Sequence, residues 1–179
     1  MELLEFLDAL RTSYLLEYEA AYRQQTEIYE MVVPEADLEI SGGVYKRIFV
    51  ADFVGINGDY KTIVEVGIGD AVYGGNASLQ YGDLSITFGS VSWDAMRFSL
   101  QPAPQELAGF ESWFDKWLDL EGLRKVEGNL LSEVIHNSRL EEGIVEMDFG
   151  SAPIDAVVEL FGIFELNGVT KAQVRSSRS

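Results

Sequence analysis

The chain has 179 residues, of which 47% are hydrophobic and none is cysteine. This composition predicts one domain spanning residues 1–179 whose core needs no disulfide, and it excludes thiol catalysis, cysteine-ligated zinc and iron–sulfur clusters. Thirty acidic residues against thirteen basic ones give a formal net charge of −17, which disfavours nucleic acid and anionic membranes as partners and favours basic proteins.

The first segment, residues 1–33, predicts one long amphipathic helix. Its apolar residues recur at steps of three and four, which places them on one face of a helix. Acidic side chains in the first turn suit the positive end of the helix dipole. Pro34 is expected to end the segment. The apolar stripe consists of Leu3, Leu7, Leu10, Tyr14, Tyr18, Ala21 and Ile28, and Phe6 and Leu15 widen it.

Residues 41–101 predict an antiparallel four-stranded meander, because the apolar period changes to two. Ile56-Asn57-Gly58-Asp59 is typical of a hairpin turn, since Asn-Gly tolerates the positive φ angles of a tight reversal. Two further strands are expected around Leu79–Phe88 and Val91–Leu100. A glycine-rich segment, Gly67–Asn76, separates the two pairs of strands.

Residues 104–175 predict a helix followed by two strands, a helix and a strand. The second helix follows Pro104 and ends near Gly122, and strands are expected near Leu131–Asn137 and Ile144–Phe149. Ser151 is the expected N-cap of the third helix, and Val169–Val174 the returning strand.

Residues 176–179 are expected to be a frayed tail. The prediction is therefore an α+β fold, in which an antiparallel meander extends into a mixed sheet with a long N-terminal helix and two further helices packed on it.

The amino-terminal residues are acidic where a secretory signal needs lysine or arginine, and no apolar run reaches the roughly 18–20 residues of a membrane span. The expected location is therefore the cytoplasm. No motif indicates a cofactor, so none is expected.

Catalytic candidates are few. His136 is the only histidine, and no Gly-x-Ser-x-Gly elbow is present, so a serine–histidine relay is not indicated. Asp52 interrupts an apolar strand and is a candidate for an inward-facing carboxylate, although a hydrogen-bonded structural aspartate is the commoner interpretation. With one histidine and no cysteine, a metal site would need carboxylates alone, and no calcium-loop pattern occurs.

The glycine-rich segment is a candidate ligand-facing lid. Gly67, Gly69, Gly74 and Gly75 resemble a phosphate-binding loop only in composition, because the third glycine of G-x-G-x-x-G and the Gly-Lys-Ser/Thr of a P-loop are missing. Together with Asp52 and His136 they are the candidates for a pocket; turns or a bulge are the alternative role for these glycines.

Two stretches are candidate partner-binding surfaces. One is the tyrosine stripe Tyr14, Tyr18 and Tyr22, whose alternative role is to pack the helix onto the sheet. The other is an acidic row beside a tryptophan on the second helix, for which the alternative is a solvated face with a second-layer tryptophan. The row consists of Glu106, Glu111, Asp115 and Asp119, and the tryptophan beside it is Trp113.

The charge is uneven along the chain. Residues 1–43 carry 10 acids and 2 bases, residues 44–104 carry 6 and 4, and residues 105–179 carry 14 and 7. We therefore expect a non-enzymatic acidic protein-binding module for a basic partner, of the inhibitor or immunity type. The alternatives are a small-molecule binding protein or enzyme with a pocket between sheet and helix, and a subunit that self-associates as a homodimer through the tyrosine helix.

Overall fold

The computed structural model describes residues 2–40, 44–68 and 77–178. Its fold is α+β, as predicted: a long N-terminal helix, two further helices, an antiparallel three-stranded sheet and a mixed six-stranded sheet. Among the described residues, none of the helices is long and apolar enough to cross a membrane.

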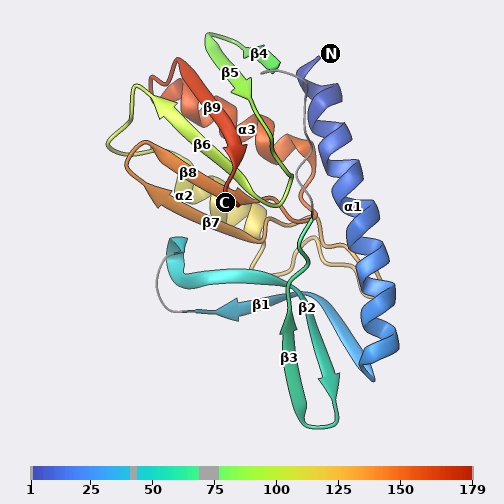
Figure 1. The fold of residues 1–179 in the computed structure, drawn as a ribbon. Helices are drawn as coiled ribbons and strands as arrows, with labels where there is room; N and C mark the ends of the chain where they lie inside the picture. The colour runs from blue at the N-terminus through green and yellow to red at the C-terminus, as the bar shows by residue number, and fades with distance from the viewer. Residues whose placement is uncertain (1, 41–43, 69–76, 179) are drawn as a thin grey trace.

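The three-stranded sheet has the order β1-β2-β3 and is antiparallel throughout. Its strands are β1 (Met31–Glu39), β2 (Ile48–Asn57) and β3 (Tyr60–Val64). The predicted hairpin turn is present, with Gly58 at a φ of 58°. Figure 1 shows the β2–β3 hairpin projecting away from the six-stranded sheet.

The six-stranded sheet has the order β4-β5-β9-β6-β8-β7. β9 runs parallel to β5 and antiparallel to β6, while β8 runs antiparallel to β6, so the predicted strand–helix–strand unit joins two parallel strands on either side of β6. The strands of this sheet are β4 (Ala77–Tyr81), β5 (Leu84–Phe88), β6 (Met96–Gln101), β7 (Asn137–Glu141), β8 (Ile144–Asp148) and β9 (Lys171–Ser176).

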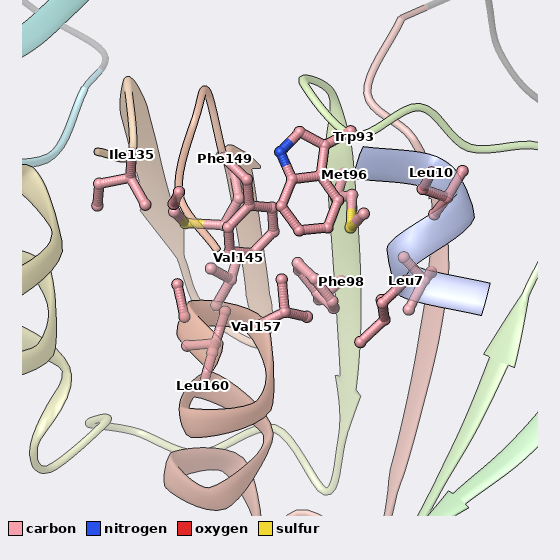
Figure 2. Close-up of a cluster of buried hydrophobic side chains, with 14 of the residues drawn as sticks. Leu7, Leu10, Trp93, Met96, Phe98, Ile135, Val145, Phe149, Val157 and Leu160 are labelled. Atoms are coloured by element: carbon pink, nitrogen blue, oxygen red, sulfur yellow. The ribbon is translucent and has the colours of Figure 1, made fainter. Parts of the chain in front are cut away.

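Helices α2 (Phe110–Leu118) and α3 (Ile154–Leu166) cover one face of the six-stranded sheet. Alternate residues of β5, β6 and β8 are buried, as a sheet with one covered face requires. Phe98 of β6 is fully buried, and its ring lies 5.5 Å from that of Phe164 and 6.3 Å from that of Phe149. Figure 2 shows part of this core, with Trp93 and Val145 near Phe149.

Helix α1 (Leu3–Ile28) runs along both sheets and connects them (Figure 1). At its N-terminal end Phe6 packs on Phe88 of β5, with ring centroids 4.5 Å apart. Further along, Tyr18 stacks on Phe53 of β2 at 4.7 Å. The buried residues of α1 are those of the predicted apolar stripe from Leu7 to Ala21, together with Phe6.

Several elements differ from the sequence prediction. The first helix ends at Ile28, and Pro34 lies inside β1, which is an edge strand and therefore tolerates a residue without an N–H group. The strand expected near Leu131–Asn137 begins only at Asn137. The strands expected to form one sheet are divided between two sheets.

The third helix and the tail also differ. The N-cap of α3 is Pro153, because the Ser151 side chain turns inward to bond Glu35. In the tail expected to fray, Arg178 donates to Ile68 O, to Ser92 Oγ and to the Asp94 carboxylate.

Candidate functional site

The tyrosine stripe belongs to the core. Tyr14 and Tyr18 are 2% and 1% exposed, and Tyr22 is half-buried against Phe53. The Tyr18 hydroxyl donates to Asp52 O at 2.8 Å, and that of Tyr14 lies 3.4 Å from Asp52 Oδ1. The stripe therefore packs α1 onto β2 and offers little surface to a partner.

The acidic row of α2 is already engaged with groups of this chain. Lys46 Nζ lies 2.9 Å from Glu111 Oε1 and 2.8 Å from Asp115 Oδ1, and the hydrogen bonds with Asp115 and Glu111 raise the pKa of Lys46. Asp119 accepts the backbone N–H groups of Leu123 and Arg124 at 3.1 and 2.9 Å.

Trp113 is only 4% exposed and donates its indole N–H to Ala156 O at 2.9 Å. It therefore packs between α2 and α3. Of the acidic row, Glu106 and Glu111 are exposed and line a hollow on the surface.

This hollow is an open groove of about 730 Å³ between the start of α2 and the β7–β8 hairpin. Four glutamates line it: Glu106 and Glu111 on the helix side, and Glu141 and Glu142 on the hairpin. All four are exposed, and no lysine, arginine or histidine is among the lining residues, although Lys46, which follows the lining residue Tyr45, pairs with Glu111. The groove, which we call the acidic groove, therefore attracts positive charge.

The floor of the acidic groove is apolar. Its lining includes Phe110 and Val145, which are 2% and 1% exposed, and the half-buried Leu107 and Leu140. Tyr45 forms one wall, and its ring packs edge-on against Phe110 at 5.1 Å. The groove thus combines a contact surface for an apolar side chain with carboxylates that select a basic one.

Asp52 and His136, the two polar pocket candidates, lie together in a buried cluster between the two sheets. His136 Nε2 lies 2.8 Å from Glu35 Oε2, and its Nδ1 lies 3.1 Å from Asp52 Oδ1 without hydrogen-bond geometry. Asp148 Oδ1 is 3.9 Å from the same ring nitrogen. The imidazole is 1% exposed, so a substrate has no direct contact with it.

Each carboxylate of this cluster is held by further hydrogen bonds. Glu35 accepts the Ser132 N–H at 2.7 Å and the Ser151 hydroxyl at 2.6 Å. Asp52 Oδ2 accepts the Val66 N–H at 2.7 Å. Glu35 lies in β1 between Pro34 and Ala36, which pair with Phe53 and Ala51 of β2, and it adopts a φ of 47°.

The cluster changes the proton affinities of its members. Burial alone would lower the pKa of His136, but the charge of Asp148 and contacts with Asp52 and Glu35 outweigh this effect and hold it well above its ordinary value. Burial raises the pKa of Asp148 to about 7. Burial would also raise the pKa of Asp52, but His136 lowers it below its ordinary value. The cluster is therefore a charged histidine held by carboxylates. It joins β1, β2 and the start of β7.

Of the glycine candidates, Gly67 is exposed and a Cβ atom there would contact nothing within 4 Å. Gly69, Gly74 and Gly75 lie outside the described residues. Within the described ranges, the structure has no group of three or more histidine or acidic side chains placed to hold a metal ion.

Two features of the buried cluster and the acidic groove were not singled out from the sequence. Glu35 looked like one more acid in an acidic segment, and no local pattern marks it as buried. In the sequence, Glu141 and Glu142 have the pattern of an ordinary charged turn. Only the fold brings them opposite Glu106.

Comparison with known proteins provides no relative: no family model, no curated protein and no solved structure matches this chain.

Proposed function

We propose that this chain is a non-enzymatic protein-binding module that docks a basic partner in the acidic groove, as an inhibitor or immunity-type protein does. The observation that carries the proposal is the lining of the groove, which has four glutamates and no basic residue around an apolar floor. The net charge of −17 adds a long-range attraction for the same class of partner.

The buried position of His136 supports a non-enzymatic role. General acid–base catalysis needs a side chain within hydrogen-bond reach of the substrate. His136 is 1% exposed and its ring nitrogens face Glu35, Asp52 and Asp148.

The test compares two variants of equal charge. In the groove variant, Glu141→Lys and Glu142→Lys reverse two exposed carboxylates of the hairpin; in the control, Glu17→Lys and Glu27→Lys reverse two exposed carboxylates of α1. Each variant gains four positive charges relative to the wild type, so only the position differs. Tagged proteins are used to capture partners from a lysate of the source organism at about 0.05 M and about 0.5 M salt.

The expected result is a basic protein that the wild type and the control retain at low salt, that high salt releases, and that the groove variant fails to retain. Association with that protein should slow by about tenfold or more in the groove variant only. Equal capture by both variants, or capture that does not depend on salt, would refute the proposal.

A second candidate is a small organic cation bound in the same groove, which lies between α2 and the sheet and has the volume of a small-molecule site. Calorimetric titration with spermine distinguishes the two. Saturable one-to-one binding that is lost in the groove variant favours the small cation, whereas no heat up to millimolar spermine excludes it.

A further inference from the structure

A second groove lies between α1 and residues 124–133, which belong to the segment that leads from α2 to β7. Its volume is about 710 Å³, which is within the range of small-molecule sites. The half-buried Leu15, Leu130 and Leu131 line it and pack against the core. Leu16 and Val126 line it as well, although they are 65% and 58% exposed. This hollow, which we call the leucine groove, therefore presents aliphatic side chains to the solvent.

Two arginines line the leucine groove, and no carboxylate of this chain pairs with either of them. Arg11 donates to Ala152 O at 2.7 Å and to Ser151 O at 3.0 Å. The Arg124 guanidinium donates to three further backbone carbonyls. Within the described ranges, the ion pairs of arginine side chains involve other arginines. Both charges are therefore left without an opposite charge, in a chain that has 30 acidic residues.

Both guanidinium groups also have N–H groups left for a ligand. An arginine side chain has five N–H donors. The Nη1 group of Arg11 takes part in neither of the two bonds to the backbone. The Nε atom of Arg124 is buried and has no hydrogen-bond partner. Since a buried donor without an acceptor is costly, an acceptor that a ligand brings into this groove would be favourable.

Two glutamates line the groove, but they do not cancel its positive charge. Glu19 pairs with Arg23 at 2.6 Å, and Arg23 is outside the lining. Glu133 is exposed and is the one remaining carboxylate of the lining. Two arginines against Glu133 leave one net positive charge, whereas the whole chain carries −17. The leucine groove therefore favours an anion, in contrast to the acidic groove.

We propose that the leucine groove binds a small amphiphile with one carboxylate and an aliphatic body, the chemistry of a medium-chain fatty acid. The carboxylate accepts N–H groups of Arg11 and Arg124 in charge-assisted hydrogen bonds, and the aliphatic body covers the leucines. Within the described part of the chain no aromatic side chain lines the groove, although 12% of the residues are aromatic, so an aliphatic body fits better than a planar ring. A hollow of this size also suits a small molecule better than a protein, whose interface covers roughly 1,200 Å² or more.

Calorimetric titration with sodium decanoate at about 0.15 M salt tests the binding. Decanoate, kept below its micelle-forming concentration, should bind one-to-one with a dissociation constant on the order of 0.1 mM. The role of the carboxylate is tested with shorter and more soluble chains. Octanoate should bind at least about tenfold more tightly than the neutral octanamide, because charge-assisted hydrogen bonds are the stronger ones. No saturable binding of decanoate up to about 5 mM, or equal binding of octanoate and octanamide, would overturn the proposal.

Two matched pairs of variants locate the site. Leu16→Asp places a carboxylate in the groove and should weaken decanoate binding by about tenfold or more, whereas Leu4→Asp makes the same change on α1 outside the lining and should leave binding unchanged. Val126→Asp and its control Leu123→Asp repeat the comparison on the other wall, which covers the case in which Leu16→Asp disturbs folding. All four side chains are exposed, so urea unfolding should match the wild type. Wild-type affinity in folded Leu16→Asp or Val126→Asp would show that decanoate binds elsewhere.

This site is independent of the proposed function. Glu141→Lys with Glu142→Lys changes no residue of the leucine groove, so this double variant should bind decanoate at least as tightly as the wild type. Failure to capture a basic protein therefore leaves the decanoate result standing, and the reverse holds as well. Loss of decanoate binding in the double variant would place the ligand in the acidic groove and overturn the assignment to the leucine groove.

Discussion

Replacing His136 by glutamine tests the role of the buried cluster. The imidazole contacts Glu35 at 2.8 Å and Asp52 at 3.1 Å, and Asp148 lies 3.9 Å away. Glutamine has a similar reach and can keep one hydrogen bond to Glu35, but it has no charge. The change therefore isolates the loss of the positive charge from the loss of volume.

The loss of folding stability caused by His136→Gln should be large. Removing one partner of a buried ion pair costs about 3–5 kcal/mol, because the remaining charges stay buried without compensation. A domain of this size has a free energy of unfolding of about 5–15 kcal/mol, so a substantial part of the stability would disappear. With a urea m-value of about 2 kcal/mol per M, the midpoint should fall by about 1.5–2.5 M.

The pH dependence follows from the direction of the shifts. The folded-state pKa of His136 is raised, so its contribution to stability is fully present below the unfolded value of about 6.5 and is lost as pH rises through the folded value. The folded-state pKa of Asp148 is raised to about 7, so the folded state also binds this proton more tightly than the unfolded chain does. Desolvation and the charge of Asp52 raise the pKa of Glu65 to about 8, although the residue as a whole is exposed. All three effects lower the stability as pH rises from about 5 to about 9.

The assay is urea unfolding followed by tryptophan fluorescence at about pH 5, 7 and 9 for the wild type and His136→Gln. The wild type should become less stable at each step, and the penalty of the substitution should be about 3–5 kcal/mol at pH 7. A penalty below about 1 kcal/mol at pH 7, or a wild type that gains stability between pH 5 and 9, would refute the assignment of a charged histidine held by carboxylates.

Two further substitutions test the surroundings of the cluster. Gly150→Ala should lower the free energy of unfolding by about 2 kcal/mol or more, because Gly150 has a φ of 49° and a Cβ atom would lie 2.1 Å from His136 Cδ2. Gly58→Ala, with a φ of 58° and nothing within 4 Å of the added atom, should cost only the backbone strain of about 1 kcal/mol, and equal losses would contradict the steric argument. Arg11→Ala should cost about 1.5–3 kcal/mol in urea unfolding, since its guanidinium donates to Ala152 O at 2.7 Å and to Ser151 O at 3.0 Å. The control Arg23→Ala removes an exposed pair with Glu19 and should cost at most about 0.5 kcal/mol, and a similar loss in both would show that α1 is not anchored through Arg11.

Local sequence patterns were sufficient to predict the features that depend on interactions between near neighbours in the chain. The turn at Asn57-Gly58 follows from the φ angles that these residues tolerate, and the buried face of α1 follows from helical periodicity. The α+β class follows from the change of period along the chain. β1 was missed because Pro34 and the acids around it resemble a loop, although an edge strand accepts both.

The charged cluster could be predicted only in part. Asp52 stood out because it interrupts an apolar strand, and His136 because it is the only histidine. Glu35 gave no such signal, since a buried glutamate in an acidic segment has the same sequence as an exposed one. Its burial depends on Ser132, Ser151 and His136, which lie about a hundred residues further along the chain.

The sequence by itself therefore determined the class of the fold, the hairpin, the faces of the helices and the acidic character of the chain. Only the tertiary structure decided how the strands divide between two sheets, which carboxylates gather around His136, and that Glu106 and Glu111 face Glu141 and Glu142 across one groove. The reason is physical: periodicity and turn chemistry act between near neighbours, whereas sheet order and charge clusters depend on contacts between distant segments that many sequences could make and only the packed fold selects.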